Sequence, residues 1–117
     1  MASSHIAHDC IVGDNVILSN LATLGGHVEI GDWAILGGGV LVHQFTKIGE
    51  HSLIGGGFRA VQDVPPYILA ADYPLKFRGV NLIGLKRRGV CKEDRRLIKK
   101  AYKIFFRSGL NRKNALE

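Results

Sequence analysis

The chain has 117 residues, 46% of them hydrophobic, and a net charge of +6 at neutral pH, so it has room for one domain or for one part of a larger one. It lacks an uninterrupted apolar run of about 18 residues, and His5, His8 and Asp9 interrupt the start, so we expect neither a transmembrane segment nor a signal peptide. Cys10 and Cys91 have no CxxC spacing, which favours reduced thiols in a cytoplasmic protein.

Charge divides the sequence into two parts. Residues 1–64 contain two Lys/Arg and six acidic residues, a net charge of −4, while residues 65–117 contain fourteen Lys/Arg and four acidic residues, a net charge of +10. All five histidines and eleven of the fifteen glycines lie in the first part. We therefore predict two structures that meet near Pro65-Pro66.

The first part is built from six-residue repeats, each of which begins with an aliphatic residue. Ten repeats follow in register, led by Ile6, Val12, Leu18, Leu24, Ile30, Leu36, Val42, Ile48, Ile54 and Ala60. A six-residue period is typical of a parallel β-helix, whereas a collagen-like segment needs another period and more proline. We expect the leading aliphatic to point inward, the glycine that often follows to permit a tight turn, and three repeats to form a coil of eighteen residues.

The basic second part predicts helices. We expect Pro65-Pro66 to stop the strands and an irregular stretch to reach Gly79. A short helix over about 80–89 and an amphipathic helix over about 92–107, ended by Ser108-Gly109, follow, and a further helix capped by Asn111 reaches Glu117. The basic face of the amphipathic helix fits a solvated surface, or a site for an acidic protein or a phosphate-bearing substrate. It does not fit nucleic acid, because the aromatic residues lie on the packing side.

The repeats begin without a polar cap, and the last expected helix is a single turn. We therefore expect the chain to be a fragment of a longer protein that is inactive by itself.

A period of eighteen places residue n+18 above residue n, about 4.7–4.9 Å away. His8 then lies below Gly26 and Gln44, and Asp9 lies below His27. This arrangement joins two imidazoles, a carboxylate and a glycine amide, the groups that a general base and an oxyanion donor require. The alternatives are histidines that are merely exposed polar residues, and a metal site, which we do not expect because the close pair of histidines is missing.

The repeats resemble those of the hexapeptide-repeat acyltransferases, which implies an all-β left-handed parallel β-helix followed by a small α-helical C-terminal domain. The motifs "HIAHDC", "GGH", "VHQF", "QDVPPY" and "GVN…GLKRRG" are similar to those of the UDP-N-acetylglucosamine acyltransferase family, over about His5 to Gly109. This family catalyses the first step of lipid A synthesis. The likeness implies two domains, the last coils over 1–64 and a helical domain over 65–117.

The resemblance also implies the role of each site residue. His8 is the general base, Asp9 orients it, and the Gly26 N–H binds the oxyanion. The substrate-binding residues that it implies are His27, His43, Gln44, Asn81 and Arg87, and the residues of the acyl-chain groove are His51 and Gly56. Ile83 replaces a glutamate of better-known members, and "DYPLKFR" lacks their histidine.

The function that follows is transfer of a 3-hydroxyacyl group from acyl carrier protein to the 3-hydroxyl of UDP-N-acetylglucosamine. We expect a cytoplasmic homotrimer with no cofactor, no metal and no nucleic-acid partner. The alternatives are another hexapeptide-repeat acyltransferase, acting on an acyl-CoA or an amine, and a trimerising scaffold without catalysis.

Overall fold

The structure is a computed structural model and describes residues 1–108. It divides into two compact units, Met1–Asn81 and a second unit that begins at Leu82, and each is described by itself. The expected helix from Asn111 to Glu117 lies outside the described residues.

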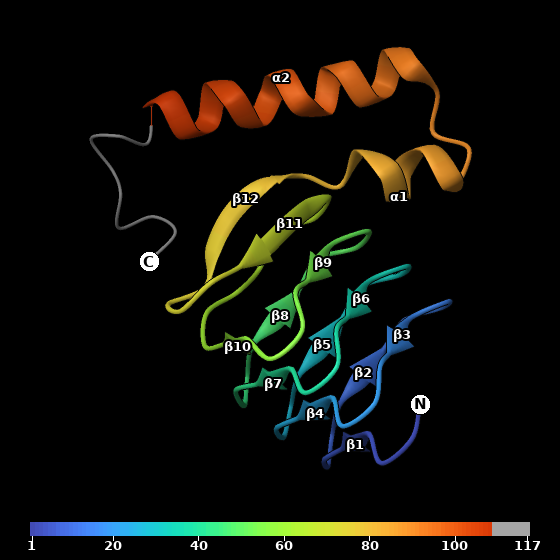
Figure 1. Cartoon of the computed structure of the whole chain (residues 1–117), viewed down its shortest axis with the longest axis vertical. Helices are drawn as coiled ribbons and strands as arrows, with labels where there is room; N and C mark the ends of the chain where they lie inside the picture. The colour runs from blue at the N-terminus through green and yellow to red at the C-terminus, as the bar shows by residue number, and fades with distance from the viewer. Residues whose placement is uncertain (109–117) are drawn as a thin grey trace. The chain divides into compact units, whose positions relative to one another are not determined.

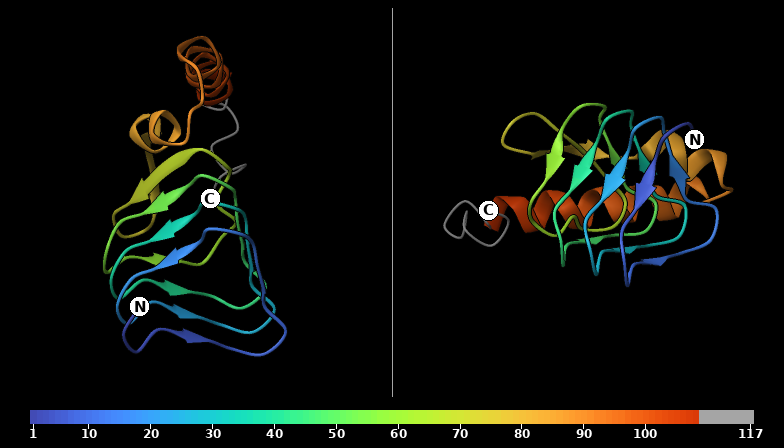
Figure 2. Two further views of the ribbon diagram at one scale, coloured as in Figure 1. Left: turned by 90° about the vertical axis from the view of Figure 1, so that its right-hand side faces the viewer. Right: turned by 90° about the horizontal axis from the view of Figure 1, so that it is seen from below.

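The first unit is a parallel β-solenoid of short strands (Figure 1). Ten two-residue strands follow one another at six-residue intervals: β1 (His5–Ile6), β2 (Ile11–Val12), β3 (Ile17–Leu18), β4 (Thr23–Leu24), β5 (Glu29–Ile30), β6 (Ile35–Leu36), β7 (Leu41–Val42), β8 (Lys47–Ile48), β9 (Leu53–Ile54) and β10 (Arg59–Ala60). They stack in parallel into three sheets, β1-β4-β7-β10, β2-β5-β8 and β3-β6-β9. Two later strands, described below, extend the third sheet beyond β9. Figure 2 shows the coils stacked one upon another.

The strand register confirms the eighteen-residue coil. Ile6 pairs with Leu24, and Leu24 pairs with Val42, so each position lies above its counterpart in the preceding coil. The leading aliphatics point inward, and from Leu24 onward they are at most 3% exposed. The fifth residue of each repeat fills the remaining space, as Ala22 and Val28 do with no exposed surface. This filled interior is the hydrophobic core of the solenoid.

Three columns of turns connect the sheets, and we name each after one of its residues. The His8 corner comprises residues 7–10, 25–28 and 43–46. The His51 corner comprises residues 13–16, 31–34 and 49–52, and the Gly56 corner comprises residues 19–22, 37–40 and 55–58. The fourth residue of a repeat adopts positive φ at these corners, for example Asp9 at 60° and His27 at 58°.

The expectation that the glycine after each aliphatic makes the turn is wrong. Positive φ falls two residues later, and of the repeat glycines only Gly39 and Gly57 adopt it. The second-position glycines instead lie against the backbone of the next coil. A Cβ on Gly25 would lie 2.8 Å from the amide nitrogen of Gln44, and a Cβ on Gly31 would lie 2.6 Å from that of Glu50. These glycines are needed because two coils approach closely there.

The expectation of an irregular stretch from Pro65 to Gly79 is also wrong, because the solenoid continues through these residues. The two-residue strand pattern gives way to β11 (Ile68–Ala71), which pairs in parallel with β9, and β12 (Lys76–Val80), which is antiparallel to β11. Pro65 and Pro66 occupy a corner, where no ladder donor is required. The unit therefore extends to Asn81, beyond the expected boundary at residue 64.

The second unit contains two helices, α1 (Leu82–Arg87) and α2 (Lys92–Ser108), at the positions that the sequence predicts. Leu85 of α1 is fully buried, and burial raises the pKa of Tyr102 on α2. Leu97 and Phe105, on the expected apolar face of α2, are 56% and 46% exposed. Among the described residues, neither helix is long and apolar enough to cross a bilayer.

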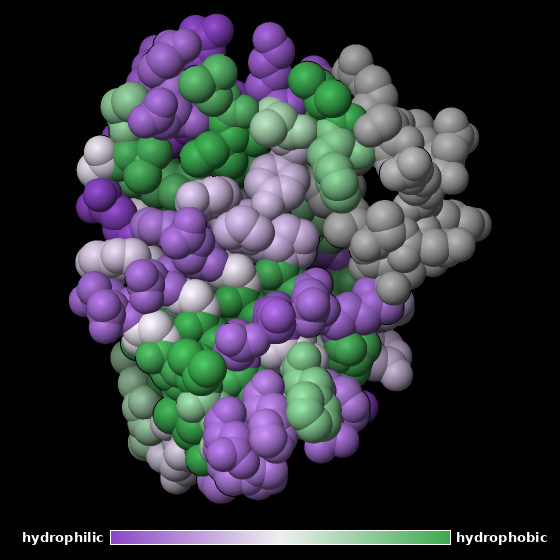
Figure 3. All heavy atoms as spheres, turned by 180° about the vertical axis from the view of Figure 1, so that it is seen from behind, coloured by the Kyte–Doolittle hydropathy of each residue, from purple (hydrophilic) through white to green (hydrophobic). Residues whose placement is uncertain are grey.

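Outward positions of the solenoid carry hydrophobic side chains as well as polar ones. Ile11 is 63% exposed and Leu41 is 45% exposed. Figure 3 shows hydrophobic residues at the surface on one side of the molecule, interspersed with hydrophilic ones. Exposed apolar area of this kind is available for contacts with a partner or a ligand.

Candidate active site

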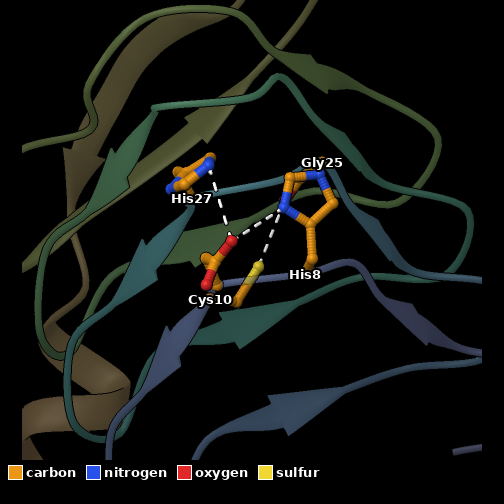
Figure 4. Close-up of polar contacts among 5 residues, drawn as sticks. His8, Cys10, Gly25 and His27 are labelled. Atoms are coloured by element: carbon orange, nitrogen blue, oxygen red, sulfur yellow. Dashed lines mark hydrogen bonds and ion pairs between the residues drawn. The ribbon is translucent and has the colours of Figure 1, made fainter.

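The His8 corner brings together a carboxylate and two imidazoles (Figure 4). Nδ1 of His8 lies 3.0 Å from Oδ2 of Asp9, and Nε2 of His27, one coil further, lies 3.7 Å from the same oxygen. Neighbouring side chains of a flat strand point to opposite faces, but the positive φ of Asp9 places its carboxylate beside His8. The rings of His8 and His27 meet edge to face with centroids 5.1 Å apart.

Asp9 fixes how His8 can act. The hydrogen bond from His8, followed by the charge of His27, holds the pKa of Asp9 below its ordinary value. Because a carboxylate accepts, the neutral imidazole of His8 carries its proton on Nδ1 in this pair, and the lone pair is left on Nε2. The His8 side chain is 72% exposed, so a ligand has direct access to it.

Gly26 lies directly against the His8 ring. A Cβ on Gly26 would lie 2.7 Å from Cε1 and 2.8 Å from Nε2 of His8, closer than carbon atoms approach one another. Any larger residue would therefore displace the ring from its place beside Asp9. Within residues 1–108 the Gly26 N–H has no backbone acceptor, whereas the flanking amides of Gly25 and His27 donate to Val42 and His8.

A hollow of about 320 Å³ extends from Gly26 over the outer face of the β4-β7-β10 sheet. Three residues predicted for the site, Gly26, His43 and Gln44, line it together. Arg59 of β10 also lines it, and the sequence analysis did not select this residue. The signal available in the sequence was charge, because Arg59 is one of only two Lys/Arg residues in the first 64.

Other predicted site residues lie at different corners. At the His51 corner, the rings of Trp33, His51 and Tyr67 stack, and Asn81 is 4% exposed and donates from Nδ2 to the His51 carbonyl over 2.9 Å. Gly56 lies at the third corner, where a Cβ would lie 3.3 Å from the Gly38 carbonyl oxygen. Arg87 ends α1 in the second unit. Within the first unit, the predicted residues therefore do not all gather around His8.

Cys10 donates from Sγ to the Gly25 carbonyl over 3.1 Å, and Cys10 and Cys91 are both free thiols. The ligand atoms of His8, Asp9 and His27 all lie within 4.8 Å of one another, a spacing at which they could also hold a metal ion.

The six-residue repeats of the solenoid and the histidine–aspartate pair at one corner are similar to those of the hexapeptide-repeat acyltransferases. The family model described as UDP-N-acetylglucosamine O-acyltransferase, domain 2, matches residues 63–117. The acyl-[acyl-carrier-protein]–UDP-N-acetylglucosamine O-acyltransferases of Thiobacillus denitrificans and Burkholderia lata are 50% and 48% identical over 93% and 95% of this chain. The chain belongs to the UDP-N-acetylglucosamine O-acyltransferase family.

Solved structures agree with the sequence comparison. The UDP-N-acetylglucosamine acyltransferase from Bacteroides fragilis superposes with a TM-score of 0.90 at 42% identity, over 97% of this chain and 44% of that one. The Acinetobacter baumannii protein gives 0.86 at 45% identity, over 91% of this chain and 41% of that one. The chain spans about two fifths of the length of its curated relatives, 42% of both the Thiobacillus and the Burkholderia protein.

Proposed function

We propose that this chain forms the acyl-transfer centre of an enzyme that moves a 3-hydroxyacyl group from acyl carrier protein to the 3-hydroxyl of UDP-N-acetylglucosamine, the first step of lipid A biosynthesis. The observation that carries the proposal is the pair of His8 and Asp9 at 3.0 Å, with the His8 ring against Gly26. The names of the relatives supply the substrates.

In the proposed reaction, Nε2 of His8 accepts the proton of the sugar 3-hydroxyl as its oxygen attacks the thioester carbonyl carbon. The carbonyl oxygen becomes an oxyanion, which the Gly26 N–H stabilises by a hydrogen bond. The carbon–sulfur bond then breaks, and His8 returns its proton to the leaving thiolate. Asp9 stabilises the imidazolium that exists between the two proton transfers, and no redox or metal step is required.

The remaining roles follow the family resemblance. His27, His43 and Gln44 contact the sugar nucleotide, and Asn81 and Arg87 bind its uridine–phosphate end. His51 and Gly56 belong to the acyl-chain groove, where glycine leaves room for a long chain. Nδ2 of Asn81 donates one hydrogen bond to the His51 carbonyl, which fixes the orientation of its amide.

A left-handed β-helix and a cytoplasmic homotrimer complete the proposal. The trimer has support in the arrangement of the corners, since the His8 corner and the His51 corner stand at opposite edges of the β2-β5-β8 sheet. A second copy can supply the missing wall of a cleft, because one β-helix face does not enclose a nucleotide sugar and an acyl chain. The basic second unit would draw the acidic carrier protein toward these clefts.

A second candidate is N-acyl transfer from an acyl-CoA. A perosamine N-acetyltransferase of Caulobacter crescentus, solved with CoA and GDP-perosamine, superposes on 64% of this chain, which covers 36% of that one, with a TM-score of 0.61 at 33% identity. This likeness covers less of the chain than the likeness to the O-acyltransferases does. Activity with an acyl-CoA and an amino sugar, and none with UDP-N-acetylglucosamine, would favour this candidate.

The test is an acyl-transfer assay on the complete protein with 3-hydroxyacyl carrier protein and UDP-N-acetylglucosamine. His8→Ala should lower kcat by about 10²–10⁴, the usual contribution of a positioned general base, with the fold unchanged by circular dichroism. His5→Ala on β1 is the matched control, because this histidine is exposed on a strand. Turnover of His8→Ala near that of the wild type would refute the assignment, and a loss of activity on chelation would reassign the cluster to a metal.

A further inference from the structure

The hollow over the β4-β7-β10 face contains a cation that the proposed reaction does not use. Arg59 is exposed and lines this hollow together with polar side chains of Thr23, His43 and Gln44. No carboxylate is among its lining residues. Among residues 1–108, Arg59 takes part in no ion pair, so its guanidinium has its charge available for a ligand.

The other cation of the first 64 residues provides the contrast. Lys47 lies on β8, on another face of the solenoid, and its Nζ lies 3.6 Å from Oε2 of Glu29 in the strand beside it. The charge of Lys47 is therefore compensated by the protein itself. Arg59 pairs in register with Leu41, and Leu41 with Thr23, so no acidic side chain stands next to it along its sheet.

We propose that Arg59 makes this hollow a subsite for a phosphate ester group of a substrate, next to the acyl-transfer centre. A guanidinium binds phosphate oxygens through two parallel charge-assisted hydrogen bonds. Gly26 lines the hollow and also lies against the His8 ring, so a phosphate held by Arg59 belongs to a molecule that reaches the reacting groups. This inference rests on the proposed function, and it makes Arg59 a positioning residue for that reaction.

Two substrates of the proposed reaction carry this chemistry. One is the diphosphate of UDP-N-acetylglucosamine, and the other is the phosphodiester in the phosphopantetheine arm of the acyl carrier protein. The shared ligand is a phosphate ester, and the source is decided by experiment.

The experiment measures the dissociation constants of the complete protein for UDP-N-acetylglucosamine and 4′-phosphopantetheine. N-acetylglucosamine and pantetheine serve as probes without phosphate. Arg59→Gln should raise the Kd of one phosphorylated probe by about tenfold or more, the usual loss for one charge-assisted contact. Arg59→Lys should lose less, because lysine keeps the charge without the planar fork. Lys47→Gln, the matched control, should leave every Kd unchanged.

The probe that responds identifies the source of the phosphate. The inference is overturned if Arg59→Gln leaves the Kd values of both phosphorylated probes within twofold of the wild type. It is also overturned if the probes without phosphate lose as much affinity as the phosphorylated ones, or if neither phosphorylated probe binds. Acyl transfer by the wild type with an unchanged Kd in Arg59→Gln refutes the subsite and leaves the proposed function standing. If phosphate binding depends on Arg59 but the complete protein shows no acyl transfer, the subsite stands and the proposed function is refuted.

Discussion

The His8 corner and the His51 corner are built from the same repeat but use their polar groups differently. At the His51 corner, Oδ1 of Asp32 accepts the Asp14 amide over 2.7 Å, and Oε1 of Glu50 accepts the Tyr67 hydroxyl over 2.7 Å. At the His8 corner, the amide of Gly26 has no such carboxylate above it, because Gln44 occupies that place. Carboxylates that accept hydrogen bonds from a backbone amide or a tyrosine hydroxyl stabilise a corner, and a glycine amide left available makes it suitable for catalysis.

Among the changes that compare the two corners, the largest effect should come from adding one methyl group at the His8 corner. Gly26→Ala places a Cβ 2.7–2.8 Å from the His8 ring and should lower kcat by about 10², the cost of misplacing a reacting group by about 1 Å. Gly38→Ala is the control at the same repeat position of another corner, where the new Cβ meets only the Asn20 carbonyl oxygen at 3.5 Å. Equal turnover of the two variants would mean that the ring position is unimportant.

The second prediction concerns stability. Asn81→Ala removes the hydrogen bond that the buried Asn81 side chain donates to the His51 carbonyl, and it should lower the free energy of unfolding by about 1–3 kcal/mol in a urea titration. His27→Ala, at the exposed corner, should change it by less than about 0.5 kcal/mol. If both variants unfold at the same urea concentration, the two corners do not differ in the way described here.

The smallest expected effect is a change in the pKa of the Asp9 carboxyl group. The pKa of Asp9 lies below its ordinary value, mainly because of the hydrogen bond from His8, so its carbon NMR signal should titrate below pH 3.8. Because the folded pKa is lowered, the stabilising contribution is present above the unfolded pKa and is lost as the pH falls through the folded one. His8→Ala should move the midpoint back further than His27→Ala does, and the reverse order would make His27 the main partner.

The sequence predicted the coil and the His8 corner because both depend on period alone. Once the repeat is eighteen residues, Asp9 must lie below His27, and the only further requirement is a corner conformation. Periodicity also explains what was missed. The fourth coil is two residues shorter, since Ile48 pairs with Val64 and Leu53 pairs with Leu69, so β11 lies out of register with the six-residue pattern.

Asp63 compensates for this shortening, because its Oδ1 accepts the Lys47 amide over 2.9 Å where a main-chain acceptor would stand in a full coil. A side-chain acceptor that takes the place of a main-chain acceptor leaves no periodic signal in the sequence. Arg59 was missed for a different reason. Its repeat position points outward in every coil, and whether an outward residue faces a hollow or open solvent depends on the neighbouring coils.

The positive φ at the fourth position of the repeats has a consequence for how such a solenoid diversifies. Side chains branched at Cβ are strained in that conformation, and the ten positions from Ser3 to Gly57 include no valine, isoleucine or threonine. Five of these ten positions carry a ring or a carboxylate, namely Asp9, His27, Trp33, Phe45 and His51. The backbone conformation thus admits reactive and aromatic groups at the corners, while it disfavours the β-branched residues that are common in the strands.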